Sequence, residues 1–254
     1  MTDLDRASTD EYQGHDSHIR TALAMLDDNR CGFARHDYDH CASEKFMINS
    51  GNRGSGSVVL ADDTAIELGS PAHRSVSLLL WTRDIRLVPD GIWVAGRDFS
   101  ATSSGSSTYA QCIICEVKDG FDPLDLKFQG LKNLANRIPG LMARSLPDRL
   151  WIRISKELHG RGFSSNALGQ CLYNAHRRHS EYIGNIAVML AVDSFFNVET
   201  LAAIAKDAVT VTSLNMRKKI ERDYDFSCDS LNCDICDDRN SCDILKDVVT
   251  GRRV

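Results

Sequence analysis

The sequence predicts an α+β fold: a mixed sheet with helices on one face, followed by a C-terminal cysteine-rich metal-binding segment. Three observations support this prediction. Residues 57–117 have mostly strand composition, and from there to residue 222 helical periodicity alternates with short apolar runs. Four of the nine cysteines then lie within residues 228–242. With 254 residues, 43% of them hydrophobic, the chain is long enough for one large core with appendages.

These patterns predict three parts. Residues 1–56 form an N-terminal tail and helical segment, because residues 1–15 are polar and Asp16 or Ser17 can cap a helix that ends near Asn29. Residues 57–222 form the α+β domain. Residues 223–254 form a four-cysteine cluster segment.

The first half of the α+β domain is predicted to be mostly strands. Strand composition marks residues 57–60, 65–68, 75–81 and 85–88. The Pro-Asp-Gly turn signal at residues 89–91 predicts that residues 92–95 fold back onto the preceding strand. Residues 109–117 form the next strand, on which Cys112 and Cys115 point to opposite faces, so this pair is interpreted as structural rather than redox-active.

Helices alternate with strands in the second half. Asp122 and Pro123 open a helix that ends at Pro139. Residues 150–155 alternate apolar and polar side chains, which predicts a strand with two distinct faces. Its arginine-bearing face is either an anion-binding surface or a solvated edge. The remaining expected elements are a helix at 165–179, with His176 and His179 at its negative pole, a strand at 186–192, and helices at 197–206 and 213–222.

Composition limits the functional classes. A net charge of −5 argues against a general nucleic-acid binder, although residues 127–161 carry eight Lys or Arg against two acidic residues. No run is long and apolar enough to span a membrane, and the first residues do not resemble a signal peptide. We therefore expect a cytoplasmic protein without a membrane partner. In that reducing compartment, clustered cysteines favour metal ligation over disulfides. The oligomeric state is not indicated.

Two further segments could be binding sites or could be ordinary connecting segments. Cys31, His36, His40 and Cys41 could supply metal ligands, but an irregular polar connection is favoured. The glycine-rich residues 51–57 could cradle a phosphate, but they precede a strand rather than open a helix, so a flexible turn is favoured.

The strongest metal pattern consists of Cys228, Cys233, Cys236 and Cys242, spaced C-x4-C-x2-C-x5-C. Four thiolates at such spacing can close around one tetrahedral zinc ion or one [4Fe–4S] cluster. Thiolate ligation suits both, so the residues alone do not choose between them.

Three segments and the cysteine block resemble, in order, the middle domain of acetyl-CoA synthase, the β subunit of the CO dehydrogenase/acetyl-CoA synthase complex. They are Asp63-Thr-Ala-Ile-Glu-Leu-Gly-Ser-Pro71, Asp90-Gly-Ile-Trp-Val-Ala-Gly-Arg-Asp98 and Leu150-Trp-Ile-Arg-Ile-Ser-Lys-Glu-Leu-His-Gly-Arg-Gly-Phe163. The resemblance covers about residues 60–242. The family's large N-terminal domain and its catalytic C-terminal domain, which includes the Cys-Gly-Cys nickel segment, have no matching segment here.

The resemblance implies several functional properties. It favours a [4Fe–4S] cluster over zinc on the four cysteines, and it makes Trp151, Arg153 and Lys156 candidates for contact with coenzyme A. It also implies a role in anaerobic one-carbon metabolism, involving CO, methyl and acetyl-CoA chemistry, as a truncated enzyme or an enzyme subunit. A CO dehydrogenase-like or corrinoid protein would be its partner. The alternative is a non-enzymatic docking or scaffold module with a structural zinc or cluster site.

Overall fold

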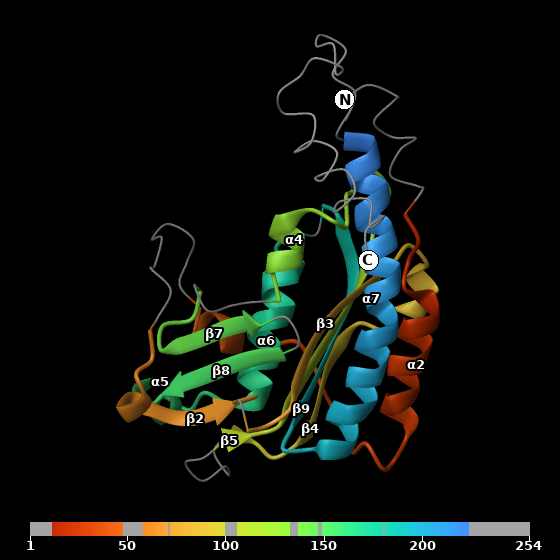
Figure 1. The fold of residues 1–254 in the computed structure, drawn as a ribbon. Coiled ribbons are helices and arrows are strands. Elements are labelled where there is room, and N and C mark those ends of the chain that lie inside the picture. Colours follow the sequence, from red (N-terminus) through yellow and green to blue (C-terminus); the bar gives the residue numbers. More distant parts are fainter. Residues whose placement is uncertain are drawn as a thin grey trace, which may run out of the picture.

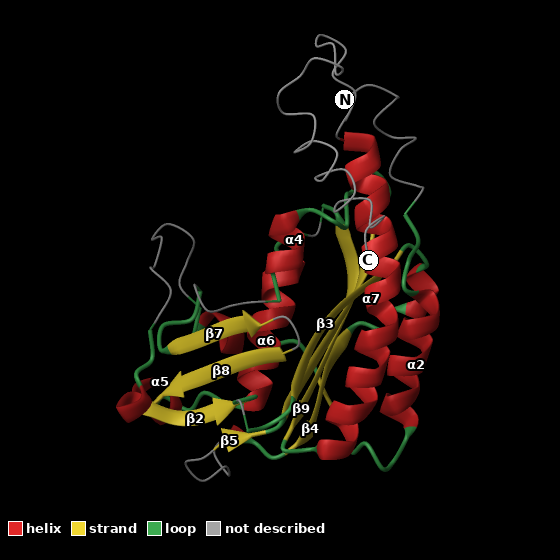
Figure 2. Ribbon diagram, in the orientation of Figure 1, coloured by secondary structure: helices red, strands yellow, loops and turns green. Residues whose placement is uncertain are grey.

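The structure is a computed structural model that describes residues 12–47, 58–70, 72–99, 106–132, 137–146, 149–179 and 181–223. Figures 1 and 2 show its elements. The strands are β1 Ala34–His36, β2 Thr64–Leu68, β3 Ser75–Thr82, β4 Gly91–Gly96, β5 Ser106–Ser107, β6 Tyr109–Val117, β7 Leu141–Leu146, β8 Arg149–Ser155 and β9 Ile183–Val192. The helices are α2 Asp16–Asp27, α3 His40–Glu44, α4 Leu126–Gly130, α5 Lys156–Gly160, α6 Ser165–Arg177 and α7 Phe195–Asp223, with 3-10 turns η2 Ala61–Asp63 and η3 Ile85–Leu87.

The strands form two mixed sheets rather than the one expected. A five-stranded sheet has the order β1-β4-β9-β6-β3, and a four-stranded sheet has the order β5-β2-β8-β7. Strands β6 and β9 are buried along nearly their whole length, so they suit the centre of a sheet that is covered on both faces. Strand β8 alternates buried and half-buried residues, so it needs a sheet with one outer face. The α+β class is confirmed.

Helices cover both faces of the five-stranded sheet, so the prediction of helices on one face is wrong. One core joins α2 and α7 to residues of β3, β6 and β9. The other core lies on the opposite face and joins α6 and the inner face of the four-stranded sheet to the same central strands (Figure 2). Cys112 lies in the first core and Cys115 in the second, which confirms that they point to opposite faces. A sheet that is apolar on both faces must be covered on each face, here by α2 and α7 on one side and by α6 and the four-stranded sheet on the other.

The turn at residues 89–91 does not produce the expected hairpin. Residues 85–87 form η3, where the Asp84 side chain accepts a hydrogen bond from the Arg86 N–H at 3.1 Å. β4 instead pairs with β9 in parallel and with β1 antiparallel. Residues 58–60 are also not a strand, since they precede η2 and the side chains of Val58 and Leu60 are exposed.

The helices differ from the predicted ones mainly in length. Among the described residues of the range 122–138, the one helix is the short α4. The unpredicted strand β7 follows it and pairs with β8. The two helices expected at 197–206 and 213–222 are one continuous helix, α7. Its middle contains β-branched residues that lower helix propensity, but Ala208 lies there in the core shared with the sheet, and Val211 is also buried. Tertiary packing therefore overrides local propensity.

The predicted N-terminal helix is confirmed as α2. Its apolar side chains Ile19, Ala22 and Met25 lie in the core shared with α7 and β3. The boundaries proposed at residues 57 and 223 stay predictions. None of the helices within the described ranges is long and apolar enough to cross a membrane.

Candidate functional site

Strand β8 has the two faces that its sequence predicts. Leu150, Ile152 and Ile154 are buried in the core beneath the four-stranded sheet. Trp151 and Arg153 alternate with them and are half-buried on the opposite, outer face. The alternation therefore brings together two of the three residues predicted to contact coenzyme A.

Glu67 on β2 holds both of these side chains. It pairs with Arg153 in the strand register. Its Oε1 accepts hydrogen bonds from Trp151 Nε1 and from Arg153 Nε, both at 2.9 Å, and its Oε2 accepts one from Ser106 Oγ at 2.8 Å. Three donors from two other strands thus converge on one carboxylate.

The Arg153 guanidinium also lies over the Trp151 ring, with Cζ 4.6 Å from the ring centroid. This is a cation–π geometry. One terminal nitrogen, Nη1, donates to the Val59 carbonyl at 3.4 Å, whereas the other has no hydrogen bond to a described residue. The pair is therefore fixed in orientation, and one end of the guanidinium has no partner among the described residues.

Glu67 is ionised at neutral pH. Burial alone would raise the pKa of Glu67, but the hydrogen bonds from Arg153, Ser106 and Trp151 outweigh it, and the pKa lies below its ordinary value. The carboxylate therefore offsets part of the Arg153 charge. Because the two side chains are only about one-fifth exposed, this offset is screened less than on an open surface.

Two more cations come from elements next to β8, namely α5, which follows it in the chain, and β7, which pairs with it. Lys156, the third predicted residue, is the first residue of α5, and its Nζ donates to the Asp62 carbonyl at 2.7 Å. Arg144 on β7 is exposed and pairs directly with Trp151, so it projects to the same face. We call Glu67, Arg144, Trp151, Arg153 and Lys156 the outer face. Their summed charge is positive.

Sequence reasoning missed Glu67 and Arg144 as members of this site. Glu67 lies inside one of the quoted segments, and Arg144 belongs to the basic stretch from residue 127 to residue 161. Only the strand register shows that they neighbour Arg153 and Trp151. That register joins residues far apart in the chain, which periodicity cannot supply.

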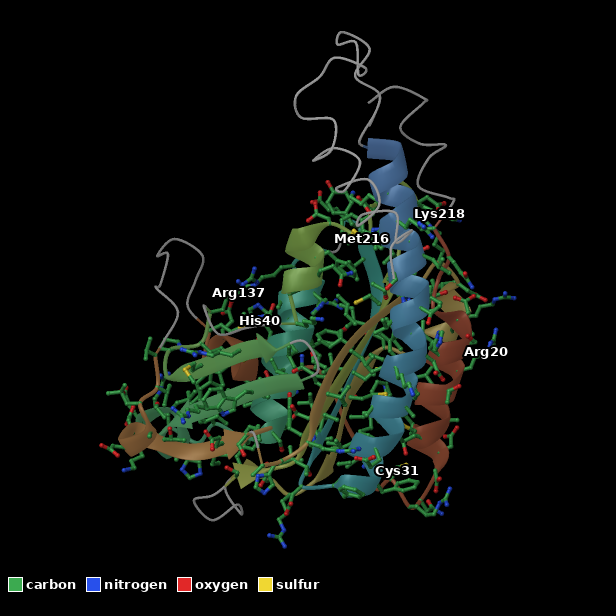
Figure 3. The ribbon with its side chains drawn as sticks, viewed as in Figure 1. Arg20, Cys31, His40, Arg137, Met216 and Lys218 are labelled. Atoms are coloured by element: carbon green, nitrogen blue, oxygen red, sulfur yellow. The ribbon has the colours of Figure 1, made fainter. Side chains whose placement is uncertain are left out.

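The predicted metal ligands Cys228, Cys233, Cys236 and Cys242 lie outside the described residues. Within the described ranges, no three His, Cys, Asp or Glu side chains gather as a metal-binding group. Cys31, His36, His40 and Cys41 are therefore not brought together. Cys31 is buried beside α7, where its carbonyl accepts from Asn197 Nδ2 at 2.8 Å, while His40 contacts Glu44 at 3.4 Å. Figure 3 shows Cys31 and His40 far apart.

Two other side chains have clear environments. Cys171 is buried, and burial raises its pKa to about 12, so it is unreactive. His176 was expected to interact with the negative pole of its helix rather than to bind a metal, and it does contact a helix carbonyl. It is fully buried, its Nδ1 lies 2.8 Å from the Leu172 carbonyl, and burial lowers its pKa to about 4. It is therefore neutral at pH 7.

The sequence of the chain matches one family of known proteins. A search of curated proteins finds no match to the chain. A family model described as the CO dehydrogenase/acetyl-CoA synthase complex beta subunit matches residues 46–195. The match includes β2 through β9 and all three segments that carry the resemblance, and it ends before Cys228. Because it covers more than half of the sequence, the chain belongs to the family of the CO dehydrogenase/acetyl-CoA synthase complex beta subunit.

Proposed function

We propose that this chain acts in one-carbon metabolism as an acetyl-CoA synthase-related subunit that binds coenzyme A on its outer face. The observation that carries the proposal is the Arg153 guanidinium, which is held over Trp151 by Glu67 and flanked by Arg144 and Lys156. Family membership supports the metabolic setting.

The outer face suits the nucleotide half of coenzyme A on chemical grounds. A guanidinium offers planar paired donors to a phosphate, and an ammonium such as that of Lys156 acts as a compact point charge. An indole ring provides a flat surface on which a purine can stack. Because Glu67 already fixes Trp151 and Arg153, little side-chain ordering would remain to oppose binding.

We further propose that Cys228, Cys233, Cys236 and Cys242 hold a [4Fe–4S] cluster in a C-terminal segment that starts near residue 223. Their spacing supports this, as does the burial of most of the described cysteines, since Cys31, Cys112, Cys115 and Cys171 are enclosed in the protein core. When bound, such a cluster supplies one-electron redox chemistry or a structural link. The alternative is a scaffold module with zinc on the same residues.

The complex named in the family description supports a proposal about the kind of protein that this chain binds. We propose that residues 57–222 act as the docking body for a CO dehydrogenase-like or corrinoid protein. Co-purification of the full chain with such a protein would support this part of the proposal, and a non-interacting chain would oppose it.

Thermal denaturation with coenzyme A tests the binding proposal. Millimolar coenzyme A should raise the melting temperature of the full chain, and Arg153→Gln should abolish most of the rise. A matched control is Arg35→Gln, because Arg35 lies over Trp93 at 5.8 Å in a second arginine–tryptophan pair outside the outer face. If the wild type shows no shift, or if both variants lose it equally, the proposal is wrong.

Metal analysis after anaerobic purification tests the cluster proposal. About four irons per chain with a brown chromophore is the expected result. A colourless chain with one zinc would favour the scaffold alternative. Single Cys→Ser variants at the four positions should each reduce the iron content, whereas Cys41→Ser, at the exposed cysteine of α3, should not.

A further inference from the structure

Strand β3 forms one edge of the five-stranded sheet. In the part of the chain that the structure describes, β6 is its only neighbouring strand. An edge strand presents a row of unpaired backbone N–H and C=O groups that can accept another strand. In Figure 1 this edge lies between α4 and α7.

The direction of each backbone group follows from two observed hydrogen bonds. The Arg74 carbonyl accepts from the Tyr109 N–H at 3.1 Å, so the carbonyl before β3 points toward β6. The Trp81 carbonyl accepts from the His15 N–H at 2.9 Å, so it points the other way. Because successive residues of a strand alternate in direction, Ser77 and Leu79 present their N–H and C=O groups to the free edge.

A groove of about 450 Å³ runs along this edge, in the size range of protein sites that hold ligands. Residues 75–80 of β3 form its floor. One wall is α7, which contributes mostly small side chains, including Ala202, Ala205 and Ala208, together with Val209. Val209 is 60% exposed, so an apolar side chain is left open to solvent beside the edge. Six strand residues span about 20 Å.

Two lysines flank the groove. Lys132 follows α4 on one side, and Lys206 projects from α7 on the other. Neither ammonium pairs with a carboxylate among the described residues. Burial lowers the pKa of Lys132, which indicates that its charge is partly removed from water. The groove therefore combines an open strand edge, an apolar wall and unneutralised positive charge.

We propose that the β3 edge groove binds an extended, acidic segment of a partner protein, which adds a strand beside Ser77 and Leu79. Side chains of the added strand alternate between the two faces. Those on the face of α7 meet the small alanines, Val209 and Lys206, and carboxylates on the opposite face meet Lys132. Backbone hydrogen bonds supply affinity, and the alternating side chains supply specificity.

The chain itself uses one end of the same edge. His15 donates its backbone N–H to Trp81, and its ring Nε2 lies 3.3 Å from Thr212 Oγ1 on α7, so this segment closes the groove at the Leu80 end. The α7 wall lies beyond residue 195, where the family match ends. The proposed docking site, on β3 and α7, is thus separate from the outer face. It would bind a partner protein in addition to the coenzyme A of the proposed function.

A blocked heptapeptide of alternating valine and aspartate, labelled with fluorescein, serves as the probe. Its anisotropy should rise on titration with the full chain, and the affinity should fall as salt increases. The double variant Lys132→Glu with Lys206→Glu should weaken binding roughly tenfold or more. Arg20→Glu, at an exposed arginine on α2 outside the groove, is the charge-matched control and should leave binding nearly unchanged (Figure 3).

N-methylation of the probe tests strand addition itself. Two methylated versions of the probe are compared, one with methyl groups on the valine nitrogens and one with methyl groups on the aspartate nitrogens. The two versions lose N–H donors from opposite edges of the peptide. One version should therefore lose binding, and the other should keep it. Hydrogen exchange should slow at the amides of Ser77 and Leu79. If both methylated peptides bind equally, or if exchange at Ser77 and Leu79 is unchanged, no strand is added and the two lysines only guard the edge against self-association.

Discussion

At the residue scale, Glu67 decides how the outer face works. It orients Trp151 and Arg153, yet its charge opposes an anionic ligand. The alternation of residues 150–155 was sufficient to predict that Trp151 and Arg153 share a face. The partner carboxylate could not be predicted, because Glu67 lies 86 positions before Arg153 and only the register of β2 and β8 brings them together.

The substitution Glu67→Gln should increase affinity for coenzyme A roughly three- to tenfold, because the amide oxygen can still accept from Trp151 and Arg153 while the opposing charge is lost. Stability should fall by about 1 kcal/mol, since the ion pair is partly exposed. Calorimetric titration measures the affinity. Glu67→Ala, which removes the acceptor as well, should bind more weakly than Glu67→Gln, and equal binding by the two variants would show that orientation by this residue is unimportant.

At the element scale, two glycines in the quoted segments lie where paired strands approach each other closely. Gly69 follows β2 with φ +64°, and an added Cβ would lie 2.4 Å from the Leu150 carbonyl oxygen. Gly96 ends β4 with φ +87°, and its Cβ would lie 1.8 Å from the Val192 oxygen. Both positions need glycine for backbone conformation and for space. The segments that carry the family resemblance therefore include residues that fix the strand junctions.

Gly69→Ala should destabilise the fold by about 2 kcal/mol or more, because it combines a left-handed backbone conformation with a clash against backbone and Ser75. Gly120→Ala separates these effects, since Gly120 has φ +80° but nothing within 4 Å of an added Cβ. It should cost only about 1 kcal/mol. Urea denaturation compares the two variants, and equal losses would show that close packing at Gly69 contributes nothing.

At the scale of the whole molecule, the sequence predicted the class of the fold better than its layers. Runs such as residues 109–117 and 186–192 identified the central strands from local composition. The second sheet and the helices on both faces could not be predicted, because they depend on pairings between distant residues, such as that of β4 with β9, which joins residues 96 positions apart. The cysteine block gave the metal prediction, but it lies outside the described residues and stays a prediction.

Two buried histidines should make global stability depend on pH. Burial lowers the pKa of His15 and of His176 to about 4 each. Unfolded histidines have a pKa near 6.5, so between pH 6.5 and 4 protons bind the unfolded chain preferentially. Stability from these groups is full above about pH 6.5 and is lost as the pH falls, by up to about 3 kcal/mol per histidine.

Urea titrations of wild type and His176→Gln from pH 7.5 to pH 4 measure this dependence. The variant is expected to be less stable at neutral pH and to lose less stability on acidification than the wild type. Parallel curves would contradict the burial of a neutral imidazole at position 176.

The most direct test of coenzyme A binding uses the three tryptophans as separate reporters in ¹⁵N NMR of the full chain. Trp81 and Trp93 are buried in the five-stranded sheet, and Trp151 lies on the outer face. Coenzyme A and adenosine 3′,5′-diphosphate should both shift the Trp151 indole N–H signal while the other two stay in place, and Arg153→Gln should reduce the shift. An unmoved Trp151 signal at millimolar coenzyme A, with or without movement of the other two, would contradict binding at the outer face.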